Sequence, residues 1–351
     1  MIRGLKLPSN PSLDSPLKVT MCLTARCNLD CRHCYADCNR ADSPLELGSS
    51  AWKTFIAEAI EAGVISFFIE GGEPLLRPDC FELLQAMCPR ALTRIRTNGT
   101  LITAALAHQL KAVGVGGVYL DFMGASPQTH DALAGVAGTH QLAREAVAHL
   151  LAVGLPVTPL IILNRANADE IGDFLTMTSD LGVREVGILR LYPIGRARRR
   201  WRELALSLDE QMHVIRSLRP PPRLRVMHAW HPQNGNCCWQ MAAVDPYGRS
   251  IGCAYLRDFV DYGNVRDIPF LKTWDHPLYR TLRQGKVAET CTTCSAVEGT
   301  DGGCRATAFA FHGRWDAPDP FDEPLNAGVD LRELPKWMLE PDERAAHSPG
   351  A

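Results

Sequence analysis

Short apolar segments alternate with amphipathic ones through the middle of the chain. The apolar segments are rich in β-branched residues, which is typical of strands buried on both faces of a sheet. They cover residues 17–23, 64–69, 115–120, 157–163 and 186–191. Helical periodicity is found over residues 50–62, 79–87, 104–113, 140–153 and 167–181. Several of these helical patterns end at a glycine, the usual stop signal of a helix, namely Gly63, Gly114, Gly154 and Gly182.

This alternation predicts an α/β fold. Strands joined by single helices and short loops form a parallel sheet with right-handed crossovers. We therefore expect an open α/β sheet or a partial barrel, and such folds bind their ligands at the carboxyl ends of the strands.

The composition is that of an ordinary globular protein, with 46% hydrophobic and 22% charged residues. The formal net charge is −2, which excludes a strongly basic nucleic-acid-binding protein. No segment reaches the roughly 18 uncharged apolar residues of a membrane-spanning helix, and the N-terminus lacks the apolar core of a signal peptide. We expect a cytoplasmic protein without nucleic-acid or membrane partners, and its thiols are then reduced.

The chain has 13 cysteines, and most of them fall into two groups. The N-terminal group consists of Cys22, Cys27, Cys31, Cys34 and Cys38. The C-terminal group consists of Cys237, Cys238, Cys253, Cys291, Cys294 and Cys304. Only Cys80 and Cys88 lie between the groups, so the spacing predicts two metal-binding regions on a cysteine-poor scaffold.

The N-terminal group contains the motif C-x3-C-x2-C, formed by Cys27, Cys31 and Cys34. Three thiolates can hold three irons of a four-iron cluster and leave the fourth iron open, whereas four cysteines are the usual number. Zinc is the alternative, and it needs a fourth protein ligand. His33 is the candidate for that ligand, although it sits awkwardly between two cysteines.

Residues 27–35 resemble the signature CNLxCxxCY of the radical S-adenosylmethionine (SAM) superfamily letter for letter, with Tyr35 as the final residue. The resemblance implies a partial (β/α)6 TIM-like barrel in which Cys27, Cys31 and Cys34 hold a 4Fe-4S cluster whose open iron is chelated by SAM. Enzymes of this family cleave SAM to a 5′-deoxyadenosyl radical that abstracts a substrate hydrogen. They take their electron from a reductant such as flavodoxin or ferredoxin.

Two further segments match motifs of the same family. Gly71, Gly72 and Glu73 belong to a GGEP segment after the second strand. The resemblance implies that both glycines allow a close approach of SAM, and that Glu73 pairs with its ammonium group. Asn98 belongs to a TNGT segment that closes the third strand, and it is expected to contact SAM.

The fourth strand departs from the family pattern. The family has SLDG there, and this chain has Asp121-Phe122-Met123-Gly124. The Asp121 carboxylate can still accept hydrogen bonds from ribose hydroxyls. Arg144, in the next helix, is a further candidate for the SAM carboxylate or else an exposed helical residue.

The C-terminal cysteines resemble the SPASM/Twitch extension, an auxiliary iron–sulfur domain of many radical SAM maturases. Cys238, Gly248 and Cys253 follow its first spacing, and Cys304 follows in a GGC segment. Two cysteines of the full pattern are missing, one of them at Thr300. The resemblance implies a degenerate domain with one auxiliary cluster, bound by Cys238, Cys253 and Cys304.

The fourth ligand of the auxiliary cluster is left open among Cys237, Cys291 and Cys294. A zinc site that includes Cys291 and Cys294 is the alternative. The other cysteines are interpreted as small buried hydrophobic residues, and these are Cys22, Cys38, Cys80 and Cys88.

Four regions follow from these assignments. Residues 1–16 form a lead-in, 17–225 the barrel, 226–323 the auxiliary domain, and 324–351 a tail rich in Pro, Glu, Asp and Ala.

The substrate is the least defined feature. A radical SAM maturase of a ribosomal peptide or protein is the first hypothesis. Small-molecule biosynthesis, by modification of a haem side chain or by dehydrogenation or epimerisation of a sugar or aminocyclitol, is the alternative, and a metal-binding protein without catalysis is a third. The weak catalytic candidates are Tyr255, Asp245 and Arg190. Arg190 and Arg196, after the sixth strand, are expected at the cavity, where arginines bind carboxylates bidentately.

Overall fold

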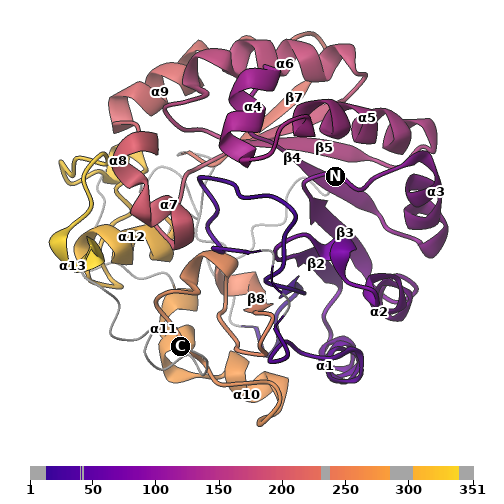
Figure 1. The fold of residues 1–351 in the computed structure, drawn as a ribbon. Coiled ribbons are helices and arrows are strands. Elements are labelled where there is room, and N and C mark those ends of the chain that lie inside the picture. The colour runs from indigo at the N-terminus through magenta and orange to yellow at the C-terminus, as the bar shows by residue number, and fades with distance from the viewer. Residues whose placement is uncertain (1–12, 40, 42, 231–237, 285–302, 340–351) are drawn as a thin grey trace, which may run out of the picture.

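The sheet is parallel and has eight strands in the order β7-β6-β5-β4-β3-β2-β1-β8 (Figure 1). The computed structural model describes residues 13–39, 41, 43–230, 238–284 and 303–339. The strands are β1 (Lys18–Cys22), β2 (Ser66–Glu70), β3 (Leu92–Thr97), β4 (Gly117–Phe122), β5 (Val157–Ile162), β6 (Glu185–Leu189), β7 (Arg225–His228) and β8 (Met241–Val244). The α/β fold expected from the alternation is thereby confirmed.

The helices that connect the strands are α1 (Ser49–Glu61), α2 (Cys80–Met87), α3 (Ala104–Val113), α4 (Pro127–Ala134), α5 (Thr139–Ala152), α6 (Ile171–Asp180), α7 (Gly195–Arg199), α8 (Trp201–Leu204) and α9 (Leu208–Ser217). Helices α10 (Phe270–Trp274), α11 (Pro277–Gln284), α12 (Arg305–His312) and α13 (Lys336–Leu339) follow β8. Short 3₁₀ turns are η1 (Pro74–Leu76), η2 (Ala168–Glu170), η3 (Cys238–Gln240), η4 (Ala254–Leu256) and η6 (Glu323–Leu325).

The predicted helices are found within one or two residues of their expected ends, with one exception. The segment expected as a helix over residues 167–181 is divided into η2 and α6. Asn167 causes the irregular start, because its side chain donates to the carbonyl oxygens of Met123 and Ile162 at 2.8 and 2.9 Å. An Asn side chain that binds nearby backbone groups competes with regular helix formation.

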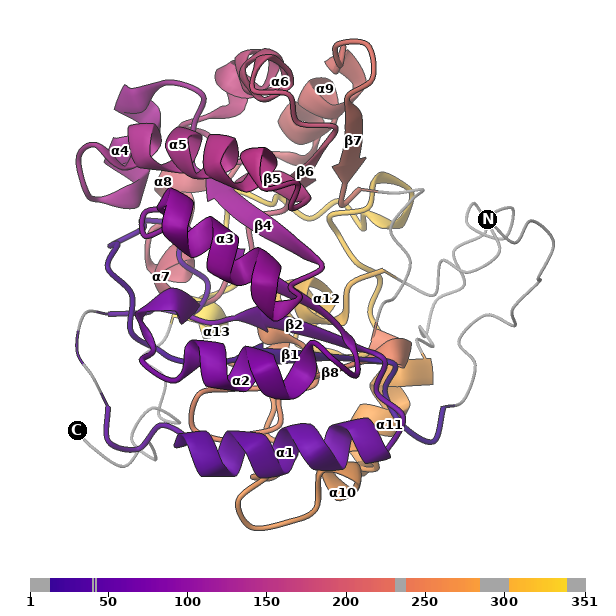
Figure 2. The ribbon, with the colours of Figure 1, turned by 90° about the vertical axis from the view of Figure 1, so that its right-hand side faces the viewer.

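Helices α1 to α6 lie along the outer face of the sheet, while the loop after β1 lies on its inner side together with α7 and α12 (Figures 1 and 2). The main core lies between the sheet and the outer helices, and it includes the fully buried Trp52, Phe67 and Phe174. A second apolar cluster joins the loop after β1 to the C-terminal helices through residues such as Leu29 and Phe311. The inner side of the sheet is thus closed by residues distant in the sequence.

Strand β7 was not expected from the sequence, and neither was the position of β8 at the edge of this sheet. Strand β7 pairs with β6, and β8 pairs with β1, from Lys18 opposite Met241 to Met21 opposite Val244. Strand β8 belongs to the segment expected to form the auxiliary domain, so that segment contributes a strand to the same sheet. No helix among the described residues is long and apolar enough to cross a membrane.

Candidate functional site

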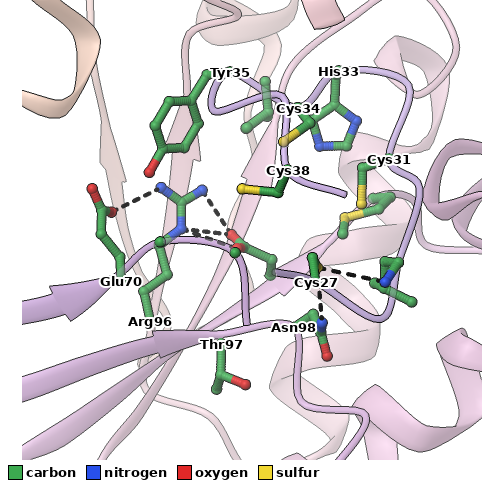
Figure 3. A pocket seen from close by; sticks show the side chains of 16 residues that line it. Cys27, Cys31, His33, Cys34, Tyr35, Cys38, Glu70, Arg96, Thr97 and Asn98 are labelled. Atoms are coloured by element: carbon green, nitrogen blue, oxygen red, sulfur yellow. Dashed lines mark hydrogen bonds and ion pairs between the residues drawn. The ribbon is translucent and has the colours of Figure 1, made fainter. Parts of the chain in front are cut away.

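A pocket lies between the loop after β1 and the carboxyl ends of the strands (Figure 3). Its lining comes from this loop and from the ends of β2, β3, β4 and β5. Eight residues expected to bind the cluster or SAM line it, namely Cys27, Cys31, Cys34, Tyr35, Gly71, Gly72, Asn98 and Asp121. Cys27 and Asp121 are 94 positions apart in the chain, yet both line this cavity. It lies at the carboxyl ends of the strands, where parallel sheets bind their ligands.

The Cys27 sulfur receives two hydrogen-bond donors. Asn98 Nδ2 lies 3.9 Å and the Leu29 backbone nitrogen 3.5 Å from Cys27 Sγ. Donors aimed at a sulfur stabilise its thiolate form and the clusters that thiolates bind. Asn98 is held in place because its Nδ2 also donates to Asn28 Oδ1 at 2.9 Å.

Cys38 is a cysteine of the pocket that the sequence interpretation treated as a core residue. It is 3% exposed, yet it lines the pocket beside Cys34. The two thiols are in hydrogen-bonding contact, which lowers the pKa of Cys34 to about 6 and raises the pKa of Cys38. Cys22 and Cys80 are buried as expected, and Cys88 is half-buried.

Gly72 allows the GGEP segment to lie directly against the loop that carries the cysteines. A Cβ at this position would lie 2.0 Å from the Arg26 carbonyl oxygen, and one at Gly71 would lie 2.6 Å from the Thr24 carbonyl oxygen. The backbone nitrogen of Gly72 donates to that Thr24 oxygen at 2.7 Å. Glycine is required here because only a residue without a side chain permits such an approach.

Glu73 lies beneath the pocket and is fully buried. Its carboxylate accepts hydrogen bonds from the Thr97 hydroxyl at 2.9 Å, the Asn98 backbone nitrogen at 2.9 Å and the Leu75 backbone nitrogen at 3.1 Å. Burial raises the pKa of Glu73 to about 7. The structure gives this side chain a role in tying the GGEP and TNGT segments together, and it is not among the residues that line the pocket.

The pocket also holds a buried cation that sequence reasoning missed. Arg96, on β3, binds the Asp121 carboxylate bidentately at 2.9 and 3.0 Å, and Arg96 Nη1 lies 3.8 Å from Glu70 Oε2. The Arg96 guanidinium also lies 5.9 Å from the centre of the Tyr35 ring. A signal was present, because an arginine within a buried strand needs a carboxylate partner. Asp121 thus forms a buried ion pair with Arg96 at the end of β4.

These residues fit the groups that the motifs imply. Three cysteines on one loop suit a cluster with one open iron, and the pocket beside them offers carboxylates, a guanidinium and closely approachable backbone for a zwitterionic ligand. His33 also lines the pocket, and its buried Nδ1 has no hydrogen-bond partner in the structure. Burial and the nearby Arg96 lower the pKa of His33 to about 4, so its ring is neutral.

The described auxiliary cysteines lie near buried tyrosines. The Tyr279 hydroxyl donates to the Gly252 carbonyl oxygen at 2.9 Å and lies 3.5 Å from the Cys238 carbonyl oxygen. Because Gly252 directly precedes Cys253, this contact brings Cys238 and Cys253 close together. Burial and the neighbouring Cys304 raise the pKa of Tyr192, and Cys253 acts in the same direction. Cys237, Cys291 and Cys294 lie outside the described residues.

Two of the predicted residues have structural partners away from the pocket, and a third is exposed on a helix. Asp245 is fully buried, and its carboxylate accepts hydrogen bonds from the Arg249 side chain at 2.7 Å and from two backbone nitrogens of its own turn. Arg190 is also buried, and it pairs with Asp319 at 2.5 Å and with Asp322. Arg144 is exposed on α5. Arg190 does not line the pocket, contrary to expectation, whereas the exposure of Arg144 matches the second of its two expected roles.

Tyr255, the third catalytic candidate, lies beside the pocket. Its ring stacks on Tyr192 and meets the ring of Tyr35 edge-on, with centroids 5.2 Å apart. Its hydroxyl is hydrogen-bonded to Arg96, although burial raises the pKa of Tyr255 above its usual value. Tyr255 therefore connects the pocket with the surroundings of Cys253 and Cys304.

Comparisons with known proteins identify two domain families and several relatives along this chain. A family model described as the radical SAM superfamily matches residues 21–177, and one described as an iron-sulfur cluster-binding domain (SPASM) matches residues 237–295. The chain is 31% identical to the mycofactocin maturase MftC of Mycobacterium tuberculosis, over 96% of this chain and 90% of that protein. It is 29% identical to the PqqA peptide cyclase of Streptomyces rochei, over 89% of this chain and 90% of that protein.

Among solved structures, the fold is similar to that of Streptococcus suis SuiB bound to the precursor peptide SuiA. The TM-score is 0.69 at 18% identity, and the match covers 89% of this chain and 76% of that chain. At this identity the likeness concerns the fold.

Proposed function

The chain belongs to the radical SAM superfamily, and from this premise we propose that it is a maturase that modifies a ribosomally made peptide. As a member of the superfamily it is an enzyme that uses SAM and iron–sulfur clusters. When bound, the cluster and SAM together supply a 5′-deoxyadenosyl radical that abstracts a substrate hydrogen.

The observation that carries the site assignment is that Cys27, Cys31 and Cys34 share a pocket with the strand-end residues. In this proposal the three thiolates hold the cluster, and Asn98 stabilises the Cys27 thiolate by donating a hydrogen bond to it. Gly71 and Gly72 keep the backbone close to the loop, so that their backbone groups can approach the methionine part of SAM.

Arg96 and Asp121 have complementary roles in the same proposal. The bidentate pair fixes the orientation of both side chains at 2.9–3.0 Å, which leaves the outer carboxylate lone pairs of Asp121 available to ribose hydroxyls. The pair also keeps a guanidinium in the pocket, where it could bind a carboxylate of the ligand. Binding is thereby directed by groups that are already ordered, which reduces its entropic cost.

The peptide substrate rests on the relatives. Proteins named as a mycofactocin maturase and a PqqA peptide cyclase match nearly the whole length of this chain, and SuiB, of similar fold, has been solved with a precursor peptide. By analogy we infer a peptide partner here, together with a one-electron reductant such as flavodoxin or ferredoxin.

The auxiliary cluster and the region boundaries complete the proposal. Cys238, Cys253 and Cys304 would bind one auxiliary cluster, with Cys237, Cys291 or Cys294 as fourth ligand, and residues 17–225 and 226–323 would be the barrel and auxiliary regions. The tyrosines that separate Cys253 and Cys304 from the pocket support a second site distinct from the first.

Anaerobic reconstitution tests the site assignment. The wild-type protein is expected to bind about eight irons per chain and to form 5′-deoxyadenosine from SAM and dithionite. The triple variant with Cys27→Ala, Cys31→Ala and Cys34→Ala should retain about four irons and form none. Eight irons in the triple variant would refute the assignment.

A second experiment tests the substrate class. Short peptides encoded beside the gene are incubated with the reconstituted protein, SAM and reductant, and products are analysed by mass spectrometry. A mass change that requires SAM and Cys27 supports a maturase. Turnover of a small molecule, with every such peptide unchanged, would favour the alternative class of substrate.

A further inference from the structure

Helix α7 lies beside the loop that carries Cys27, Cys31 and Cys34 (Figure 1). Arg196, on this helix, donates hydrogen bonds to the loop. The guanidinium donates from Nη1 to the Cys31 carbonyl oxygen at 3.0 Å and from Nη2 to the Cys38 carbonyl oxygen at 2.7 Å. The Arg196 backbone nitrogen donates to the Cys34 carbonyl oxygen at 2.8 Å. One residue thus binds the loop at three points.

The residue before Arg196 explains how α7 comes so close. Gly195 has φ +56°, and a Cβ there would lie 2.4 Å from the Tyr35 carbonyl oxygen. Its backbone nitrogen donates to Asp258 Oδ2 at 3.1 Å. The start of α7 is therefore held between the cysteine loop and the segment that follows Cys253, and only glycine permits this arrangement.

The charge of Arg196 is held on the inner side of the loop. Its side chain is 15% exposed, whereas its carboxylate partners Asp30, at 2.7 Å, and Asp37, at 3.5 Å, are 67% and 40% exposed. The carboxylates are therefore more solvated than the guanidinium, and the guanidinium acts on the cysteines through a less polar medium. A positive charge beside a cluster stabilises the more negative, reduced state and so raises the reduction potential.

We propose that Arg196 is a positioning residue for the SAM-binding cluster. It holds the backbone of the loop so that the thiols of Cys27, Cys31 and Cys34 keep their relative positions, and its charge raises the reduction potential of the cluster. This differs from the carboxylate clamp at the cavity that the sequence predicts for Arg196. The proposal rests on the assignment of these three cysteines as ligands.

Two variants separate geometry from charge. Arg196→Lys keeps the positive charge, but a lysine cannot bind both carbonyl oxygens as the planar guanidinium does. Arg196→Gln loses the positive charge as well as this two-point contact. Arg202→Gln is the matched control, because Arg202 lies nearby on α8 and pairs with Glu333 at the surface with 77% exposure. Two quantities are measured anaerobically. The first is the rate at which a chelator removes iron. The second is the midpoint potential of the SAM-binding cluster, identified by its EPR signal, which shifts on addition of SAM.

Both Arg196 variants should lose iron from this cluster about tenfold faster than wild type, since supporting contacts of metal sites have effects of this size. The midpoint potential should fall in Arg196→Gln and stay near wild type in Arg196→Lys. Arg202→Gln should match wild type in both measurements. Wild-type potential and iron retention in Arg196→Gln would overturn the proposal.

The same experiment separates this proposal from the one on which it rests. If the wild-type signal that shifts with SAM survives in the triple cysteine variant, both proposals fail. If that signal requires the three cysteines but is insensitive to Arg196, only the role of Arg196 is refuted. Far-ultraviolet circular dichroism of each variant shows whether the fold is retained, and Arg196→Lys provides the test if Arg196→Gln does not fold.

Discussion

Tyr192 and Tyr255 stack face to face, with ring centroids 3.8 Å apart and ring planes 3° from parallel. Tyr192 follows β6, whereas Tyr255 belongs to η4, directly after Cys253. Tyr35, at the end of the cysteine motif, meets Tyr255 from the pocket side. The stack therefore joins the barrel strands to the auxiliary segment at the boundary of the pocket.

Removing the Tyr255 ring should weaken this junction. Tyr255→Leu loses the stack on Tyr192 and is expected to lower the free energy of unfolding by about 1–3 kcal/mol. Tyr255→Phe keeps the stack and loses only the hydroxyl contact with Arg96, so a decrease of at most about 1.5 kcal/mol is expected. Urea unfolding of the metal-free protein measures both. Equal losses in the two variants would show that the ring contributes nothing beyond its hydroxyl.

Disruption of the ion pair of Arg190 with Asp319 and Asp322 should lower the free energy of unfolding more than the loss of the Tyr255 ring. All three side chains are 0% exposed, so Arg190→Met removes a buried cation from beside two buried carboxylates. The expected cost is about 3–5 kcal/mol of unfolding free energy at neutral pH. The exposed pair of Arg202 with Glu333 is the control, and Arg202→Gln should cost about 1 kcal/mol or less. Denaturant unfolding distinguishes these values, and a small effect of Arg190→Met would contradict a stabilising role.

Gly72→Ala tests the close approach of the GGEP segment. The new Cβ would lie 2.0 Å from the Arg26 carbonyl oxygen, so the loop that leads into Cys27 must shift. We expect a loss of about 1–3 kcal/mol in stability, together with less iron bound after reconstitution. Gly172→Ala is the matched control, because a Cβ there meets no atom within 4 Å and alanine favours a helix. Wild-type iron content in Gly72→Ala would mean that the loop tolerates the displacement.

Glu73 makes stability depend on pH. Burial raises the pKa of Glu73 from 4.5 to about 7, so the folded state binds its proton more tightly than the unfolded state. The contribution of Glu73 to stability is fully present below pH 4.5 and is lost as the pH rises through about 7. Wild type should therefore lose about 3 kcal/mol relative to Glu73→Gln between pH 4.5 and 8. Chemical unfolding of both proteins across this range measures the difference, and parallel pH profiles would refute it.

Much of the fold follows from local patterns. The runs that became β2, β4, β5 and β6 are apolar on both faces, and helices such as α3 end at the predicted glycine because that residue adopts the left-handed conformation. Strands β7 and β8 have four residues each; β7 is half polar, whereas β8 is apolar. Such short segments carry no periodic signal, and their pairing is decided by tertiary contacts.

The cysteine loop and the glycines of the pocket could also be anticipated, because fixed spacing identifies them. Contacts between distant residues could not. Arg190 and Asp319 are 129 positions apart, and Arg196 lies 165 positions from Cys31. The residues that flank an arginine do not show whether its guanidinium binds a substrate, a buried carboxylate or a backbone carbonyl oxygen. The binding partner is decided by the fold. Asp245 was likewise misplaced, since its carboxylate closes its own turn.

The hydrogen-bonded pairing of β8 with β1 limits the motion between the two cysteine regions and determines where the chain can be truncated. Cys27 comes five residues after β1, and Cys238 belongs to the turn η3 that leads directly into β8. The two cysteine regions are thus attached to adjacent hydrogen-bonded strands, and a hinge motion cannot separate them without breaking the pairs from Lys18–Met241 to Met21–Val244. Access to the space between them has to come from movement of loops. Removal of the C-terminal region would leave β1 as an edge strand with unpaired backbone groups, which favours aggregation.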